Sequence, residues 1–452
     1  MDRSSGESRL AGGTSSAGRP AELVSRSREL EHVAVRTLLE DDTEPRVQWA
    51  APDGVEIVGR GVAARVRAAG PDRFELIRTQ ASRLFAGLAH DGPEQARPRA
   101  FGGFSFHDGH DPGGPWTGFP AASFVIPRVL VSRTDDGTWL TTVADRADDA
   151  EDRLERWHER LTASTTESNG DPKASDSTPG VRSTTGTTSP EEWTRQVERA
   201  LERIDAGSLT KVVLAQALSV DLEGAVDVPA TLERLGRRYP NCYRFLVGHE
   251  DGGTFFGAPP ERLVSKRGDQ VETEALAGSV ARGETPDEDE AYAERMRADA
   301  KLGHEHGLVV DAIREQLAPL ARELTIRERT VRRLATIQHL QTPIEALLEG
   351  DRHVLEIVEA LHPTPAVGGV PPDAAWETIR DTETFDRGWY AAPIGWFDAA
   401  GDGEFAVGIR SGVATDGSVT LFAGNGIVAD SDPDEEWDEV QLKFRPILDE
   451  LR

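Results

Sequence analysis

The chain has 452 residues, enough to bury a sizeable core, and its 79 acidic and 51 basic residues give a formal net charge of -28. This charge excludes a general electrostatic attraction to nucleic acid or to an anionic membrane surface. An anionic substrate would therefore need local cations or a metal ion to hold it.

The basic residues and the cysteine content narrow the class of protein further. Nearly all basic residues are arginines; the only lysines are Lys173, Lys211, Lys266, Lys301 and Lys443. An acidic, lysine-poor surface stays soluble in concentrated salt, and the composition resembles that of proteins from salt-adapted archaea. Cys242 is the sole cysteine, which excludes an intrachain disulfide. No apolar run is long enough for a membrane span or placed as in a signal peptide, so we expect a cytoplasmic protein.

Composition divides the chain into four parts. Residues 1–22 are rich in Ser and Gly and predict a disordered tail, and residues 161–189 predict a low-complexity linker or surface insertion. Residues 23–160 mix short apolar alternations with Gly and Pro turns, which indicates an N-terminal α+β region without a chemical motif. The sharper signals all lie in residues 190–452.

The first of these signals is a helix followed by strands. Ser189 can cap a helix whose first residue is a proline, and Gly207 can end it. Strands are then expected over residues 209–222, 255–267 and 270–280, around a Gly-Ala-Pro-Pro turn.

Later elements follow the same alternation. The sequence from Thr285 to Glu288 has the form of a capping box and predicts a long helix to about Leu324. A final helix is expected to begin at Asp432. Between the two helices we expect strands over 390–398, 404–412 and 419–428. This order favours an α+β, layered α/β fold with antiparallel sheets in the core and helices outside.

Glu305 stands out within the helix after Thr285. It shares one helical stripe with Leu302 and Val309, so a carboxylate replaces an apolar side chain on a face that should pack inward. An inward carboxylate can bind Mg²⁺ or pair with an arginine, and the pattern leaves both open.

The last helix places Glu436, Glu439 and Lys443 along one edge, at helical spacing. A solvated charged face is the ordinary explanation. The preceding Gly424 and Gly426 favour a binding site instead, because glycines let the backbone approach a bound group.

Lys211 and Glu261 are two further candidates. Lys211 lies inside an apolar strand, where burial disfavours an ammonium group and suits a general base; an edge-strand lysine that blocks aggregation is the alternative. Glu261 directly follows the Gly-Ala-Pro-Pro turn, and alone it would be a surface residue.

Eight motifs then occur in a recognisable order: KVVLAQ, GAPPERL, EALAGSVARG, GHEHGLVVDAI, LHPTPAVGG, DRGWYAAPIGW, GIRSG and FAGNGIVADSDPDEEWDEVQLK. In order and approximate spacing they resemble the chorismate-utilising family, which includes isochorismate synthases, salicylate synthases, anthranilate synthase large subunits and aminodeoxychorismate synthases. The resemblance covers residues 190–452 and implies a chorismate-binding fold, chorismate as substrate and Mg²⁺ as cofactor.

The resemblance also implies roles for individual residues. Glu305 and Glu439 would coordinate Mg²⁺ directly, and Glu436 would do so through water. The substrate contacts would be Ala277, Gly278, Ser279, His339, Tyr390, Arg410, Gly424, Gly426 and Lys443. Two positions depart from the family pattern: Asn425 stands where the family usually has Ala, and Leu302 stands where a carboxylate would precede Glu305.

Lys211 indicates the branch of the family, because amine-adding members usually carry a residue such as Gln there. By resemblance, Lys211 deprotonates the water that attacks carbon 2, and Glu261 protonates the departing 4-hydroxyl. We therefore expect an isochorismate synthase, serving menaquinone biosynthesis, without a glutaminase subunit. The alternatives are a salicylate synthase, an anthranilate synthase large subunit and an inactive paralogue. The sequence does not indicate the oligomeric state.

Overall fold

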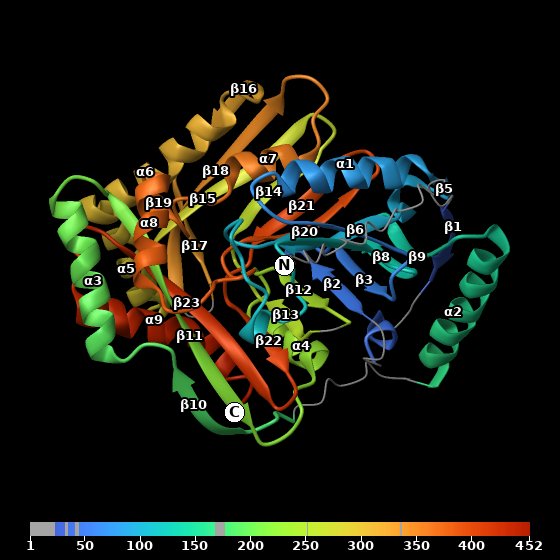
Figure 1. The fold of residues 1–452 in the computed structure, drawn as a ribbon, viewed down its shortest axis with the longest axis horizontal. Coiled ribbons are helices and arrows are strands. Elements are labelled where there is room, and N and C mark those ends of the chain that lie inside the picture. The colour runs from blue at the N-terminus through green and yellow to red at the C-terminus, as the bar shows by residue number, and fades with distance from the viewer. Residues whose placement is uncertain (1–22, 32–34, 41–44, 168–176, 251, 335–336) are drawn as a thin grey trace, which may run out of the picture.

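The computed structural model describes residues 23–31, 35–40, 45–167, 177–250, 252–334 and 337–452, without the side chains of Ser279 and residues 164–167. Two large sheets pack against each other and helices surround them (Figure 1). Only the pairing of residues 23–26 with 88–91 is parallel among the described strands. The expected layered fold is confirmed; the expected tail, 1–22, lies outside the described residues.

The first sheet contains thirteen of the described strands. Their order is β10 (Val181–Gly186), β11 (Lys211–Leu222), β23 (Ser418–Ile427), β22 (Ser411–Thr415), β13 (Thr254–Gly257), β12 (Arg244–Gly248), β2 (Arg46–Ala50), β3 (Glu56–Arg60), β8 (Val129–Thr134), β9 (Gly137–Ala144), β1 (Leu23–Leu30) and β5 (Leu88–Asp91), with β19 (Gly369–Val370) beside β11.

The second sheet contains ten of the described strands. Their order is β16 (Ala321–Ile326), β18 (Ile337–Leu348), β15 (Gln270–Ala281), β14 (Arg262–Arg267), β21 (Gly403–Val407), β20 (Pro393–Asp398), β6 (Arg99–Phe104), β7 (Ala122–Ile126) and β4 (Ala64–Ala68), with β17 (Thr330–Arg333) beside β18. Each sheet thus combines strands of the expected N-terminal region with strands of residues 190–452, and the two regions share their sheets.

The helices lie outside the sheets (Figure 1). They are α1 (Arg73–Ala86), α2 (Ala147–Glu167), α3 (Pro190–Asp205), α4 (Val228–Arg238), α5 (Pro286–Ala298), α6 (Ala300–Leu317), α7 (Val354–Leu361), α8 (Pro372–Thr382) and α9 (Pro433–Leu448), with 3-10 turns at Val35–Leu38, Glu94–Ala96 and Gly114–Trp116. The expected start of α3 is confirmed, since the Glu192 amide donates to Ser189 Oγ at 3.2 Å. Among the described helices, none has the length and apolar character needed to cross a membrane.

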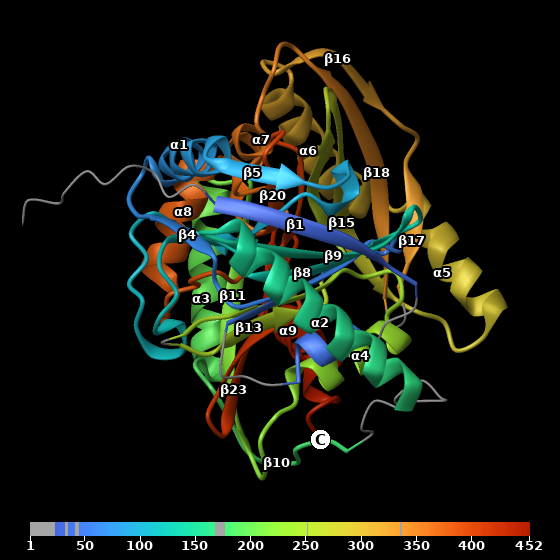
Figure 2. The same cartoon turned by 90° about the vertical axis from the view of Figure 1, so that its right-hand side faces the viewer.

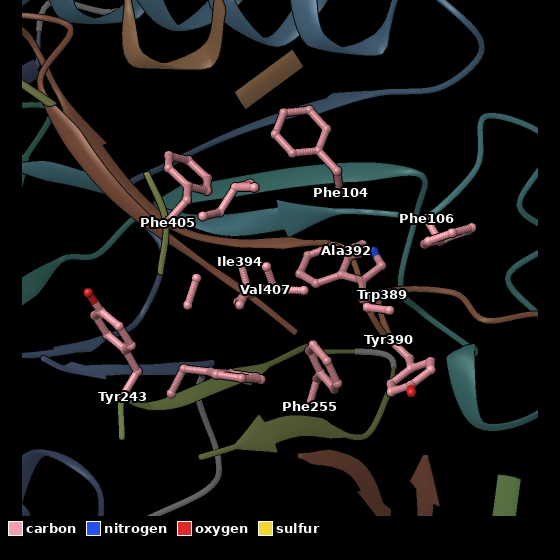
Figure 3. Close-up of a cluster of buried hydrophobic side chains, with 14 of the residues drawn as sticks. Phe104, Phe106, Tyr243, Phe255, Trp389, Tyr390, Ala392, Ile394, Phe405 and Val407 are labelled. Carbon is pink, nitrogen blue, oxygen red and sulfur yellow. The ribbon is translucent and has the colours of Figure 1, made fainter. Parts of the chain in front are cut away.

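An aromatic core fills the space between the sheets (Figure 3). Phe104 and Phe405 of the second sheet and Phe255 of the first sheet are fully buried. Trp116, from the N-terminal region, stacks on Phe422 of β23 at 5.1 Å between ring centroids. The N-terminal region therefore packs against β23 through Trp116. Strand β23 lines the candidate site described below.

The prediction of one long helix from Thr285 to about Leu324 is wrong in the extent of the helix. Asp299 adopts an extended conformation and caps a second helix, accepting a hydrogen bond from the Leu302 amide at 3.0 Å. The chain therefore forms α5 and α6, and α6 ends at Leu317. Leu324 lies in β16 opposite Ala346 of β18, because pairing along a sheet edge outweighs helix propensity there.

Two further expectations differ from the structure. The expected linker, 161–189, is partly regular: α2 continues to Glu167 and packs against β1 and β9 (Figure 2), and β10 pairs with β11. The strand expected over 404–412 is divided between the sheets as β21 and β22. Arg410 stands at this change of sheet with a φ of 50°, a rare conformation for a residue with a side chain.

Candidate active site

A cavity of about 250 Å³ lies where β11 and β23 of the first sheet meet β15 and β18 of the second. Helices α6 and α9 complete its wall, and every lining residue belongs to the region 190–452. Thirteen of the candidate site residues line it together: Lys211, Glu261, Ala277, Gly278, Glu305, His339, Tyr390, Arg410, Gly424, Gly426, Glu436, Glu439 and Lys443. Ser279 lies in β15 opposite His339, and its side chain is outside the described residues.

Lys211 is the first residue of β11 and is only 2% exposed. Its Nζ donates to Glu305 Oε1 at 2.8 Å, so the buried ammonium is paired with the carboxylate of α6. This burial excludes the aggregation-blocking edge lysine. Gly426 makes room for the pair, because a Cβ there would lie 2.9 Å from Lys211 Cε and 3.4 Å from Glu305 Oε1.

Glu261 leaves the Gly-Ala-Pro-Pro turn toward the cavity and is 5% exposed, so it is not a surface residue. Burial, with the nearby Glu274 carboxylate, raises the pKa of Glu261 to about 8, while Lys211 and Arg332 oppose the shift. A carboxyl group with this pKa carries a proton at neutral pH. Glu261 can therefore act as a proton donor inside the cavity.

Arg410 supplies a buried cation to the cavity. Its guanidinium forms no ion pair with any described residue and donates only to the Lys443 carbonyl, at 3.4 Å. Burial lowers the pKa of Arg410, which reflects the desolvation of this charge. An enclosed arginine that faces a cavity can bind a carboxylate with two parallel hydrogen bonds, so Arg410 favours an anionic ligand.

Tyr390 and His339 border the same part of the cavity. Burial raises the pKa of the Tyr390 phenol, which stays protonated and can donate a hydrogen bond. Burial, aided by Arg410 and Lys443, lowers the pKa of His339 to about 3. Its ring is therefore neutral, and Nδ1 carries the proton because it lies 3.3 Å from the Gly278 carbonyl, which can only accept.

Carboxylates gather on the side of the cavity formed by α6 and α9. Burial, followed by the neighbouring Glu439, raises the pKa of Glu436 to about 7. Burial acts on Glu439 in the same direction, but the Lys443 ammonium, 2.9 Å away, outweighs it and lowers the pKa of Glu439. Within the described part of the chain, no three His, Cys, Asp or Glu side chains are grouped closely enough to form a ready-made metal site.

These carboxylates nevertheless suit a hard divalent cation. Glu305, Glu436 and Glu439 line one cavity, and burial, with the neighbouring Glu439, lets Glu436 retain a proton near neutral pH. The other two carboxylates form ion pairs with lysines: Glu305 pairs with Lys211, and Glu439 pairs with Lys443. Carboxylate oxygens are ligands that Mg²⁺ prefers, and Mg²⁺ needs only one or two protein carboxylates.

The model for chorismate binding enzymes matches residues 11–452 of the chain. The chain belongs to the chorismate-binding enzyme family. It is 32% identical over 447 residues to isochorismate synthase MenF of Bacillus subtilis, covering 95% of this chain and 94% of the relative. It is 35% identical over 418 residues to the salicylate biosynthesis isochorismate synthase of Pseudomonas aeruginosa, covering 91% and 86%.

Solved structures give the same family fold. MenF, the menaquinone-specific isochorismate synthase from Escherichia coli, superposes with a TM-score of 0.78 at 27% identity, covering 97% of both chains. Anthranilate synthase component I from Streptococcus pneumoniae, at 19% identity and a TM-score of 0.70, shares the fold.

Sequence reasoning assigned no role to three cavity residues or neighbours of this chorismate-binding enzyme. Lys301 and Asn425 line the cavity, and Glu274 lies beside Glu261. A usable signal existed for Lys301: the chain has only five lysines, and Lys301 precedes Glu305 by one helical turn. The Glu274 carboxylate accepts from Arg332 at 2.7 Å, from the Arg262 amide at 3.2 Å and from Gln341, and nothing local in the sequence shows this.

We expect Glu274→Gln to move the alkaline limb of the pH profile of kcat/KM to lower pH. A role for Glu261 as a proton donor requires its protonated form, so activity should fall as pH rises through its pKa of about 8. Removing the Glu274 charge, and freeing the Arg332 charge that it holds, both lower the pKa of Glu261. The measurement compares profiles of the unchanged and variant enzymes at fixed Mg²⁺ and salt; an unmoved limb contradicts the coupling.

Proposed function

We propose that this protein is an isochorismate synthase that adds water to carbon 2 of chorismate, with loss of the 4-hydroxyl, in menaquinone biosynthesis. The observation that carries the proposal is the cavity in which Lys211 and Glu261 are both buried beside Arg410, which forms no ion pair with any residue that the structure describes. The two curated relatives named above support it, since both are isochorismate synthases and each match covers most of both chains. Lys211 argues against amine addition, and no glutaminase subunit is then required.

The proposed reaction needs one proton transfer at each of two residues. Arg410 and Tyr390 hold a substrate carboxylate by charge-assisted and phenolic hydrogen bonds. Lys211, as the neutral amine, accepts a proton from the water that attacks carbon 2. Glu261 gives its proton to the 4-hydroxyl, which leaves as water while the ring double bond migrates. One water enters and one leaves, so atoms and protons balance.

Glu305 and Glu439 would hold Mg²⁺ directly, and Glu436 would hold it through water. When bound, the cation neutralises and orients the carboxylate on the substrate ring. Glu305 would then no longer serve as the acceptor of the 2.8 Å hydrogen bond from Lys211. Lys211 Nζ would then be available to the attacking water.

Product analysis tests the proposal. Purified protein is incubated with chorismate and Mg²⁺ at low and at high salt, since the acidic, lysine-poor composition suggests salt adaptation. We expect isochorismate as the product, and none without Mg²⁺. Salicylate with pyruvate would replace the proposal by a salicylate synthase. Anthranilate formed only with ammonia would remove the role of Lys211, and a protein without Mg²⁺-dependent chorismate binding would be an inactive paralogue.

A further inference from the structure

Asn425 connects oppositely charged groups on the face of α9 that borders the cavity. It lies in β23 between Gly424 and Gly426 and is 5% exposed. Its Oδ1 accepts from Lys443 Nζ at 2.6 Å, and its Nδ2 donates to Glu436 Oε2. Lysine can only donate, so the amide oxygen faces Lys443 and the amide nitrogen is left to donate to Glu436.

Asn425 is one of three acceptors that Lys443 contacts. Lys443 lies 2.9 Å from Glu439 and 3.1 Å from the Gly424 carbonyl. If Glu439 turns toward a divalent cation, Lys443 loses a partner, and the amide oxygen of Asn425 remains as a neutral acceptor for it. The amide nitrogen meanwhile compensates the buried oxygen of Glu436 and fixes the direction of its carboxylate.

We infer that Asn425 is a positioning residue that prepares Glu436 and Glu439 for a divalent cation by bridging Lys443 and Glu436, which gives Lys443 a neutral acceptor and fixes the direction of the Glu436 side chain. The inference rests on the proposed Mg²⁺ dependence. It concerns this chain in particular, because an alanine, the usual residue of the family at this position, has no group that could form either hydrogen bond. Partners that orient metal ligands in this way commonly contribute 10- to 100-fold to metal affinity.

Calorimetric titration of Mg²⁺ into the full-length protein tests the inference at one fixed salt concentration. We expect Asn425→Ala to raise the Kd for Mg²⁺ by about 10- to 100-fold. The matched control is Asn241→Ala, the same change at an exposed residue outside the cavity, which should leave the Kd unchanged. The Mg²⁺ concentration that gives half-maximal turnover should rise with the Kd of Asn425→Ala, which a purely structural defect would not produce.

Thermal unfolding without metal shows whether Asn425→Ala is folded. If it is not, Asn425→Ser provides the test, because a serine hydroxyl is too short to bridge Lys443 and Glu436. A folded variant that binds Mg²⁺ as tightly as the unchanged protein would overturn the inference and leave the proposed function standing. An unchanged protein that binds no Mg²⁺ would overturn the proposed metal dependence, and the role of Asn425 with it.

Discussion

Lys211→Ala and Glu261→Gln should each reduce chorismate turnover by about 10²- to 10⁴-fold, the usual contribution of a general acid or base. Each substitution removes one of the two proton transfers that the proposed reaction needs. The measurement is kcat at saturating chorismate and Mg²⁺, with isochorismate quantified directly. Near-normal turnover in either variant would remove the corresponding role.

Lys211→Arg separates proton transfer from charge. An arginine can keep the ion pair with Glu305, but its guanidinium does not give up a proton in the accessible pH range. We expect this variant to be as slow as Lys211→Ala. Mg²⁺ binding should survive in Lys211→Ala, because Glu305 loses the ammonium group that occupies it at 2.8 Å. If Lys211→Arg were active, Lys211 would act through its charge alone.

The sequence singled out residues that the fold brings to one cavity, because several of them are chemically conspicuous in their own segments. Lys211 interrupts an apolar strand, Glu305 interrupts an apolar helical stripe, and Arg410 stands in a motif of the family. These three residues come from β11, α6 and the link between β21 and β22, and they line one cavity. The capped start of α3 was predictable for the same local reason.

The parts that could not be predicted depend on contacts between distant segments. Asp299 could continue one helix or cap the next one. In the fold it caps α6, whose packing on β15 favours this arrangement. The division of residues 404–412 between two sheets has no local cause in the sequence. Glu274 lies beside Glu261 and pairs with Arg332, 58 positions along the chain, and only the folded structure shows this arrangement.

A buried ion pair behind β11 is a second feature that only the fold reveals. Glu383 and Arg387 lie 2.5 Å apart, and both side chains are 3% exposed. Arg387 donates to the carbonyls of Val213 and Val367 at 2.7 and 2.9 Å, and Glu383 accepts from the Ala215 amide at 2.8 Å. The pair thereby provides hydrogen-bond partners for backbone groups of β11 in the segment that pairs with neither β19 nor β10.

Arg387→Met should therefore destabilise the protein by about 3–5 kcal/mol, because it leaves the Glu383 carboxylate buried without its cation. That is a large fraction of the stability of an ordinary protein. The measurement is urea unfolding of both forms. Val213 and Val367 line the cavity, so turnover of this variant should fall at urea concentrations below those that unfold the whole protein.

The double variant Glu383→Gln with Arg387→Met distinguishes the charge from the packing. Glutamine still offers an oxygen to the Ala215 amide but carries no charge, so no uncompensated carboxylate remains. We expect the double variant to be more stable than Arg387→Met alone, which gives a favourable coupling in the double-mutant cycle. If the two destabilise equally, the cost lies in the lost hydrogen bonds to Val213 and Val367, and the ion pair acts as a backbone support rather than as a charge pair.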